Sequence, residues 1–89
     1  MQTAYRLYSN HGWRGNVQEF RNADAGRAWR NELGQLPSHD SRGVRITYRE
    51  FDVNNRLPGR GRDAQRFLIG SDGSIFFTAD HYGTFVRIR

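Results

Sequence analysis

The second half of the chain contains short runs of β-branched and aromatic residues separated by turn signals, and this pattern constrains the fold more than any other feature. Residues 44–53 (VRITYREFDV) are rich in β-branched and aromatic types, which favour β-strands. Three shorter runs of the same kind cover residues 66–70, 75–79 and 84–89. Because short turns connect the last three runs, we expect sequential strands to pair as an antiparallel meander of about four strands.

Residues 24–33 show the periodicity of a helix instead. Asp24 can cap the first turn, and the apolar positions that follow recur on one helical face. These positions are Ala25, Ala28, Trp29 and Leu33. Gly34 then provides a typical helix stop. We therefore expect one helix on the N-terminal side of the sheet.

The first 20 residues contain aromatic and aliphatic side chains without a clear period. Gly12 and Gly15 interrupt them and argue against a continuous helix, which favours a short strand or hairpin. The length of 89 residues fits one domain over residues 1–89. The sequence thus predicts an α+β fold in which a meander sheet packs against one N-terminal helix.

Arginine dominates the charge of the chain. All 14 basic residues are arginines, and the formal net charge is +5. The guanidinium group matches phosphate oxygens two at a time, so this composition favours a polyanionic partner, although solubility alone would also account for it. The absence of cysteine excludes disulfides and cysteine-based sites. No apolar run approaches the length of a membrane helix, and no signal peptide is recognisable, so we expect a mature, recombinant or excised chain.

Four residues of the second half form a set suited to phosphodiester transfer. Glu50 lies in the first predicted strand, Arg62 and Arg66 lie at the start of the next, and His81 lies in the last turn. A carboxylate can remove the proton of a ribose 2′-hydroxyl, and an imidazole can protonate the departing 5′ oxygen. Fixed cations can stabilise charge on the phosphoryl oxygens. This chemistry needs no metal, no metal-ligand cluster is recognisable, and we expect no cofactor.

Three sequence blocks that contain these residues resemble the barnase family of microbial guanyl-preferring ribonucleases. The blocks are residues 48–52 (YREFD), 62–66 (RDAQR) and 80–85 (DHYGTF). They are similar, in this order, to the family's segment around the general base, its paired phosphate-binding arginines and its segment with the general acid. The resemblance covers residues 43–89, about half of the chain.

The resemblance implies a microbial ribonuclease fold, trimmed or divergent at its N-terminus, and an endoribonuclease without a metal cofactor. Family members cleave single-stranded RNA after guanosine through a 2′,3′-cyclic phosphate. Glu50 would act as general base and His81 as general acid. Arg62 and Arg66 would bind the scissile phosphate, and Tyr82 would line the substrate site.

Residues 29–37 (WRNELGQLP) allow two incompatible assignments. They match the length of the family's guanine-reading loop, which implies substrate-binding roles for Asn31 and Glu32. However, Leu33 stands where the base-reading glutamate is expected, and Glu32 stands one place early. Most of this segment also belongs to the helix expected over residues 24–33, and the periodicity favours that helix.

The expected substrate is single-stranded RNA, and the expected protein partner is an acidic barstar-like inhibitor, because a basic cleft is complementary to an acidic surface. We expect a monomer that is secreted or delivered into a target cell as a toxin. The alternative function is a non-catalytic basic RNA-binding module whose aromatic side chains stack on bases. A basic structural domain without RNA activity is a third interpretation. Cleavage of RNA in the presence of a chelator separates the first function from the other two.

Overall fold

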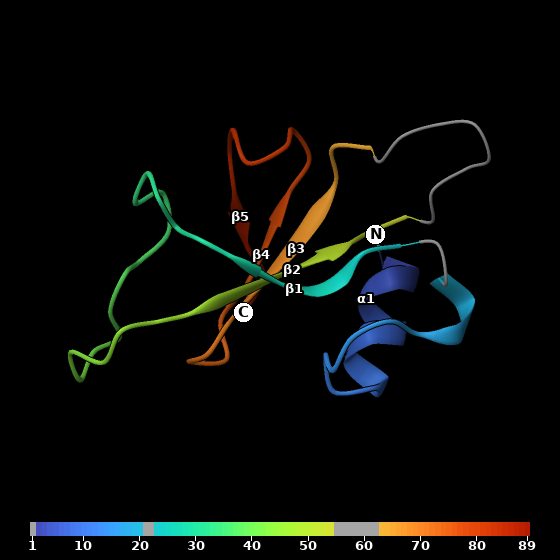
Figure 1. Cartoon of the computed structure of the whole chain (residues 1–89), viewed down its shortest axis with the longest axis horizontal. Coiled ribbons are helices and arrows are strands. Elements are labelled where there is room, and N and C mark those ends of the chain that lie inside the picture. The colour runs from blue at the N-terminus through green and yellow to red at the C-terminus, as the bar shows by residue number, and fades with distance from the viewer. Residues whose placement is uncertain (1, 21–22, 55–62) are drawn as a thin grey trace.

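The structure, a computed structural model, describes residues 2–20, 23–54 and 63–89. A helix, α1 (Gln2–Asn10), and a short 3-10 helix (Gln18–Phe20) precede a five-stranded antiparallel sheet. Its strands are β1 (Ala25–Trp29), β2 (Tyr48–Asp52), β3 (Arg66–Gly70), β4 (Ile75–Thr78) and β5 (Val86–Arg87). The strands lie side by side in chain order, so the sheet is a meander (Figure 1). The α+β class and the meander are confirmed, and β3 has the bounds that the sequence predicts.

The helix expected over residues 24–33 is wrong, because this segment forms β1 and the loop after it. Gly26 has a φ of +83°, and the register shifts between Ala25 and Arg27, which marks a β-bulge. The apolar residues of the supposed helical face are not buried together, since Leu33 is 84% exposed. Pairing with β2 satisfies the backbone of β1, and this long-range pairing outweighs the local periodicity.

The strand or hairpin expected in residues 1–20 is also wrong, because α1 occupies most of this segment. Ala4 and Tyr8, one helical turn apart, are both buried. Gly12 has a φ of +68° and follows the last helical turn. This glycine therefore ends the helix, as a left-handed residue after a helix commonly does, and does not interrupt it.

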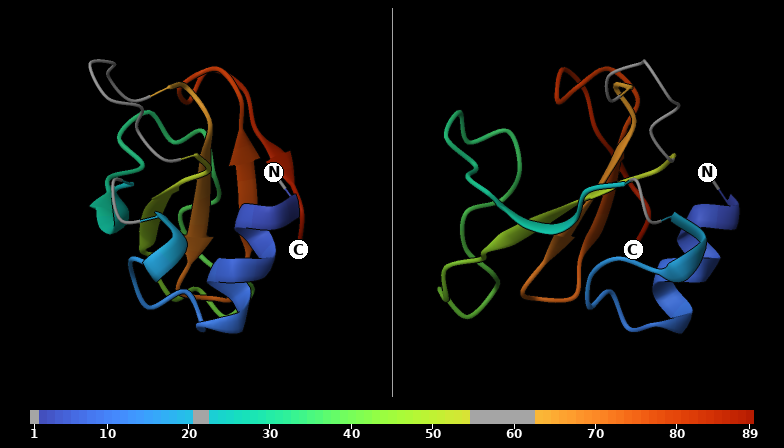
Figure 2. Two further views of the ribbon diagram at one scale, coloured as in Figure 1. Left: turned by 90° about the vertical axis from the view of Figure 1, so that its right-hand side faces the viewer. Right: turned by 45° about the vertical axis from the view of Figure 1, so that its right-hand side comes forward.

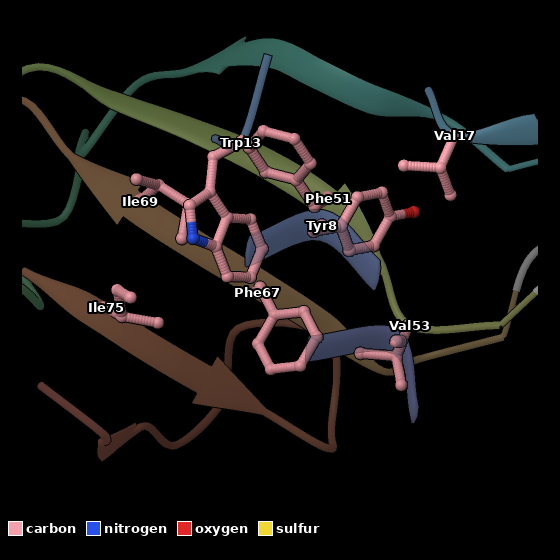
Figure 3. Close-up of a cluster of buried hydrophobic side chains, with 9 residues drawn as sticks. Tyr8, Trp13, Val17, Phe51, Val53, Phe67, Ile69 and Ile75 are labelled. Atoms are coloured by element: carbon pink, nitrogen blue, oxygen red, sulfur yellow. The ribbon is translucent and has the colours of Figure 1, made fainter. Parts of the chain in front are cut away.

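The helix α1 lies on one side of the sheet (Figure 2). The main apolar core fills the space between them (Figure 3). Its buried members are Ala4, Tyr8, Trp13, Val17, Phe51, Val53, Phe67, Ile69 and Ile75. The Tyr8 hydroxyl donates a hydrogen bond of 2.7 Å to the backbone carbonyl of Asp52, and burial, followed by the charge of Asp52, raises the pKa of Tyr8 to about 12. This bond ties α1 to the end of β2.

The opposite face of the sheet carries a second, smaller apolar cluster. Its buried members are Leu36, Ile46, Tyr48, Leu68 and Phe76, with Trp29, Tyr82 and Phe85 packed against them. The segment between β1 and β2, residues 30–47, extends away from α1 and supplies part of this cluster (Figure 1). This face has no helix over it in the described part of the chain, and none of the described helices is long and apolar enough to cross a membrane.

Candidate active site

Strand alternation places the candidate residues of β2 and β3 on the face opposite α1. Glu50 and Asp52 are two residues apart on β2, so their side chains leave the same face. The register pairs Asp52 with Arg66 and Arg66 with Thr78. These three residues form a row beside Glu50. The row ends next to the turn after β4, which carries His81.

The side chain of Arg66 is only 2% exposed. Its Nε lies 3.1 Å from Oδ1 of Asp52, a carboxylate that is 3% exposed. Its Nη1 donates to the backbone carbonyl of Gln65 at 2.7 Å and lies 3.4 Å from Oδ1 of Asp63. The other carboxylate oxygen of Asp52 accepts a hydrogen bond from the backbone N–H of Asp24. Arg66 is therefore fixed in a buried ion pair beneath the surface of the site.

Tyr82 connects Glu50 with His81. Its hydroxyl donates a hydrogen bond to Oε2 of Glu50 at 2.5 Å, and the Glu50 carboxylate is largely buried. The ring of Tyr82 lies with its centroid 4.8 Å from that of His81. The predicted base and the predicted acid thus belong to one site, with Tyr82 in contact with both. The imidazole of His81 is exposed, where a bound substrate can reach it.

Asp80 holds the turn that carries His81 and Tyr82. Its Oδ1 accepts hydrogen bonds from the backbone N–H groups of Gly83 at 3.0 Å and Thr84 at 2.8 Å, and its Oδ2 accepts from the Thr84 hydroxyl. These bonds, those from Thr84 first, lower the pKa of Asp80 to about 2. His81 and Tyr82 have φ values of +56° and +71°, a conformation that side-chain-bearing residues rarely adopt. The carboxylate of Asp80 therefore stabilises an unfavourable turn at the site.

Aromatic rings from three segments meet above the sheet beside Glu50. Trp29, at the end of β1, stacks on Tyr82 with centroids 5.3 Å apart and planes 28° apart. Phe85 and Tyr48 pack edge-on against Trp29. Because the two stacked rings touch, a nucleobase can lie between them only after they separate. The side-chain amide of Gln35 donates to the backbone carbonyl of Tyr82 at 2.7 Å, which links the β1–β2 loop to the turn.

Asn31 folds its own loop. Its amide donates to the Leu36 carbonyl at 2.6 Å, and its Oδ1 accepts from the Leu36 N–H at 3.1 Å. These hydrogen bonds of Asn31 shape the loop, while the neighbouring Glu32 is exposed. Gly34 has a φ of +64° in the same loop. Residues 30–37 form a loop, so the helix expected over this segment is wrong, and the guanine-reading role of the loop stays a prediction.

The structure brings most of the predicted site residues to one end of the open face. They are Glu50, Arg66, His81 and Tyr82. Arg62 lies outside the described residues. No group of three or more side chains that could hold a metal ion occurs within residues 2–20, 23–54 and 63–89.

Sequence analysis missed three residues that build the site. Asp80, followed by Gly83 and Thr84, has the pattern of an Asx turn, which could have identified it. Asp52 lies two residues after Glu50 and therefore on the same face, a signal that strand alternation offers. Trp29 was not predicted as a site residue because its segment was interpreted as a helix.

A family model described as ribonuclease matches residues 1–89. The chain belongs to the ribonuclease family. Residues 1–28, for which the sequence motifs offered no counterpart, are part of this match. Membership in this family supports an endoribonuclease that acts on RNA.

Curated relatives agree with this family assignment. A ribonuclease of Heyndrickxia coagulans is 39% identical over 83 residues, which are 88% of this chain and 71% of the relative. Ribonucleases of Bacillus intermedius and Bacillus pumilus are also 39% identical over 83 residues, again 88% of this chain. The chain spans 48% of the length of each of these two Bacillus relatives.

Proposed function

We propose that this ribonuclease is a metal-independent endoribonuclease that cleaves single-stranded RNA after guanosine. The observation that carries the proposal is the contact of Tyr82 with both Glu50 and His81 on the open face of the sheet. A carboxylate and an imidazole on one substrate-accessible site supply a general base and a general acid. Arg66, held by the carboxylate of Asp52, fixes a guanidinium group beside Glu50.

In the proposed reaction, Glu50 accepts the proton of the ribose 2′-hydroxyl while that oxygen attacks the adjacent phosphorus. The bond from phosphorus to the 5′ oxygen breaks, and His81 protonates the departing oxygen. The products are a 2′,3′-cyclic phosphate and a 5′-hydroxyl, so atoms and protons balance. Arg66 stabilises the phosphoryl oxygens electrostatically from its buried position, and Arg62 is proposed to contact them directly.

Tyr82 must move before RNA can bind in this way. Its hydroxyl occupies the Glu50 oxygen that would accept the substrate proton, and its ring lies directly on Trp29. When Tyr82 withdraws, Glu50 is open to the 2′-hydroxyl and the two rings can stack on a base. The exposed carboxylate of Glu32 in the adjoining loop is the proposed acceptor for the N–H groups of guanine, with Asn31 holding the loop.

A digest of a defined RNA in EDTA tests the function. The substrate is a single-stranded oligonucleotide with one guanosine, and its control carries 2′-deoxyguanosine at that position. We expect one cut after guanosine with a 2′,3′-cyclic phosphate end, and no cut in the control, which lacks the nucleophile. Intact RNA that is nevertheless bound would support the RNA-binding module instead, and cleavage of the control at a similar rate would refute the mechanism.

We also propose that the protein acts as a monomer that is secreted or delivered into a target cell as a toxin, with an acidic inhibitor protein in the producing cell. The net charge of +5 favours an acidic partner. Co-expression with a candidate acidic inhibitor should restore growth to cells that produce the active chain. An inhibitor that protects equally well against a chain of reversed surface charge would contradict this proposal.

A further inference from the structure

We propose that Arg27, on the edge strand β1, is a further catalytic residue whose guanidinium group contacts the non-bridging oxygens of the scissile phosphate during the reaction. The inference rests on the proposed ribonuclease function and adds a residue to its mechanism. Arg27 lies outside the three sequence blocks that resemble the barnase family. Three observations carry the inference, namely the register of Arg27, its exposure and its ion pair with Asp24.

Strand pairing places Arg27 directly beside the proposed general base. The β-bulge at Gly26 shifts the register of β1, so that Arg27 and not Gly26 is the partner of Glu50. Paired residues of antiparallel strands point to the same face, with Cβ atoms about 5 Å apart. Trp29 and Tyr48, the next pair on this face, are in ring contact, as this register requires. Arg27 therefore borders Glu50 on the open face.

Arg27 and Arg66 differ in how freely they can meet a phosphate. The Arg66 side chain is 2% exposed and is held by the buried carboxylate of Asp52. The Arg27 side chain is 63% exposed, and its Nη1 lies 3.1 Å from Oδ2 of Asp24, whose side chain is 31% exposed. Solvent screens an ion pair of this kind, so the pair contributes little. Arg27 can therefore exchange the Asp24 carboxylate for a phosphate at small cost, whereas breaking the buried pair of Arg66 is costly.

The backbone that carries Arg27 is tied to the buried ion pair. The backbone N–H of Asp24 donates to Oδ2 of Asp52 at 2.9 Å, and the backbone N–H of Asp52 donates to the carbonyl of Asp24 at 2.8 Å. The Asp52 carboxylate thus holds Arg66 through one oxygen and the segment that enters β1 through the other. A cation on such an ordered backbone loses less entropy when it contacts a substrate.

The reaction increases negative charge where Arg27 can reach it. As the 2′ oxygen attacks and its proton passes to Glu50, the phosphorus becomes five-coordinate and its non-bridging oxygens carry more charge. Because Glu50 must lie beside the attacked phosphate, a cation paired across from Glu50 lies beside these oxygens. The planar guanidinium can donate two N–H groups to them, and this contact is strongest in the transition state.

The test uses the dinucleotide GpU, whose single phosphate is the scissile one, so that no other phosphate contact contributes. We expect Arg27→Ala to lower kcat/KM about 30-fold, the scale of one charge-assisted hydrogen bond, and Arg27→Lys to restore part of the loss. The matched control is Arg6→Ala, which removes the same charge from an exposed position of α1, on the other side of the sheet (Figure 2). The control should cleave GpU at the wild-type rate. Because Arg27 is exposed, its variants should unfold near the wild-type urea midpoint.

Phosphorothioate substrates distinguish a direct contact from a distant effect of charge. In each of the two diastereomers of the GpU phosphorothioate, sulfur replaces one non-bridging oxygen and accepts hydrogen bonds less well. The wild-type enzyme should cleave the diastereomer whose sulfur faces Arg27 more slowly than GpU, and Arg27→Ala should reduce this difference. If Arg27→Ala cleaves GpU as fast as wild type, or loses rate with both sulfur effects unchanged, the inference is overturned. Failure of the wild-type enzyme to cleave either GpU or a longer RNA would instead refute the proposed function.

Discussion

Neighbouring residues of the same strands form an apolar core on one face of the sheet and the charged candidate site on the other. Toward α1, Phe51 on β2 pairs with Phe67 on β3, and both are fully buried in the main core. Toward the open face, Glu50 and Arg66 precede these two residues directly in the sequence and carry charge. A shift of one position therefore separates a core residue from a site residue, because successive side chains of a strand point to opposite faces.

This difference teaches that stability and function can be altered separately by substitutions one residue apart. The helix-covered face is apolar and gains stability from burial. The open face contains a buried ion pair, which stabilises a fold little but fixes the guanidinium of Arg66 beside Glu50. The predictions below test how complete this separation is.

The largest expected effect belongs to the helix-covered face. Phe51→Ala removes a ring that contacts both Tyr8 and Trp13, and it should lower the free energy of unfolding by about 4 kcal/mol. Urea denaturation measures this loss. The matched variant Glu50→Gln keeps the shape of its side chain and should unfold near the wild-type midpoint. An equal loss of unfolding free energy in the two variants would contradict the proposal that one face provides stability and the other the site.

A substitution at Asp52 should affect both stability and activity. Asp52→Asn removes the buried charge that faces the guanidinium of Arg66 and leaves it, among the described residues, only the exposed carboxylate of Asp63, 3.4 Å away. Breaking a buried ion pair in this way should cost about 3 kcal/mol. Because Arg66 also loses its fixed position, kcat should fall even under conditions in which the variant is fully folded. Denaturation and steady-state kinetics on the same samples check both effects. A stable variant with full activity would show that the ion pair contributes neither to folding stability nor to catalysis.

Tyr82→Phe tests the open face alone. The substitution keeps the ring that lies on Trp29 and removes the hydroxyl that occupies Glu50 in the free enzyme. Because this hydrogen bond must break when RNA binds, KM should fall about threefold while kcat stays near the wild-type value. Stopped-time assays across substrate concentrations measure both constants. A lower kcat with an unchanged KM would mean that the hydroxyl supports Glu50 during the reaction.

The smallest effect concerns the turn and depends on pH. Hydrogen bonds lower the pKa of Asp80 from 3.8 to about 2, so its stabilising contribution is present above the ordinary value and is lost as pH falls through about 2. Asp80→Asn should therefore be less stable than wild type at neutral pH, and the difference should shrink as the pH falls from 3.8 to about 2. Denaturation curves over this range give the measurement. A difference that grows on acidification would contradict the sign of the shift.

The sequence predicted the second half of the fold because its pattern is local and unambiguous. The strands of residues 66–70 and 75–79 are short apolar runs on either side of a turn, and they pair with each other. The structure predicted for the first half of the chain was wrong at the segment where long-range contacts decide the structure. Segment 24–33 pairs with β2, and Gly26 forms a bulge in that pairing, neither of which helical periodicity can reveal.

In the candidate site, too, local motifs predicted some residues, and others depend on long-range contacts. Motifs around Glu50, Arg66 and His81 predicted residues that the structure brings to one face. The contact of Trp29 with Tyr82 joins β1 to the turn after β4, and no local pattern predicts a pairing across that distance in the chain. The burial of Arg66 likewise follows from tertiary packing around Asp52.

The pH dependence of RNA cleavage tests the central claim most directly. Glu50 must be ionised and His81 must be protonated at the same time, so kcat/KM should give a bell-shaped profile. His81→Ala should lower the rate about 100-fold and remove the alkaline limb, and Glu50→Gln should remove the acidic limb. An enzyme that keeps near-full activity and an intact alkaline limb after His81→Ala would contradict the assignment of His81 as the acid, and with it the proposed mechanism.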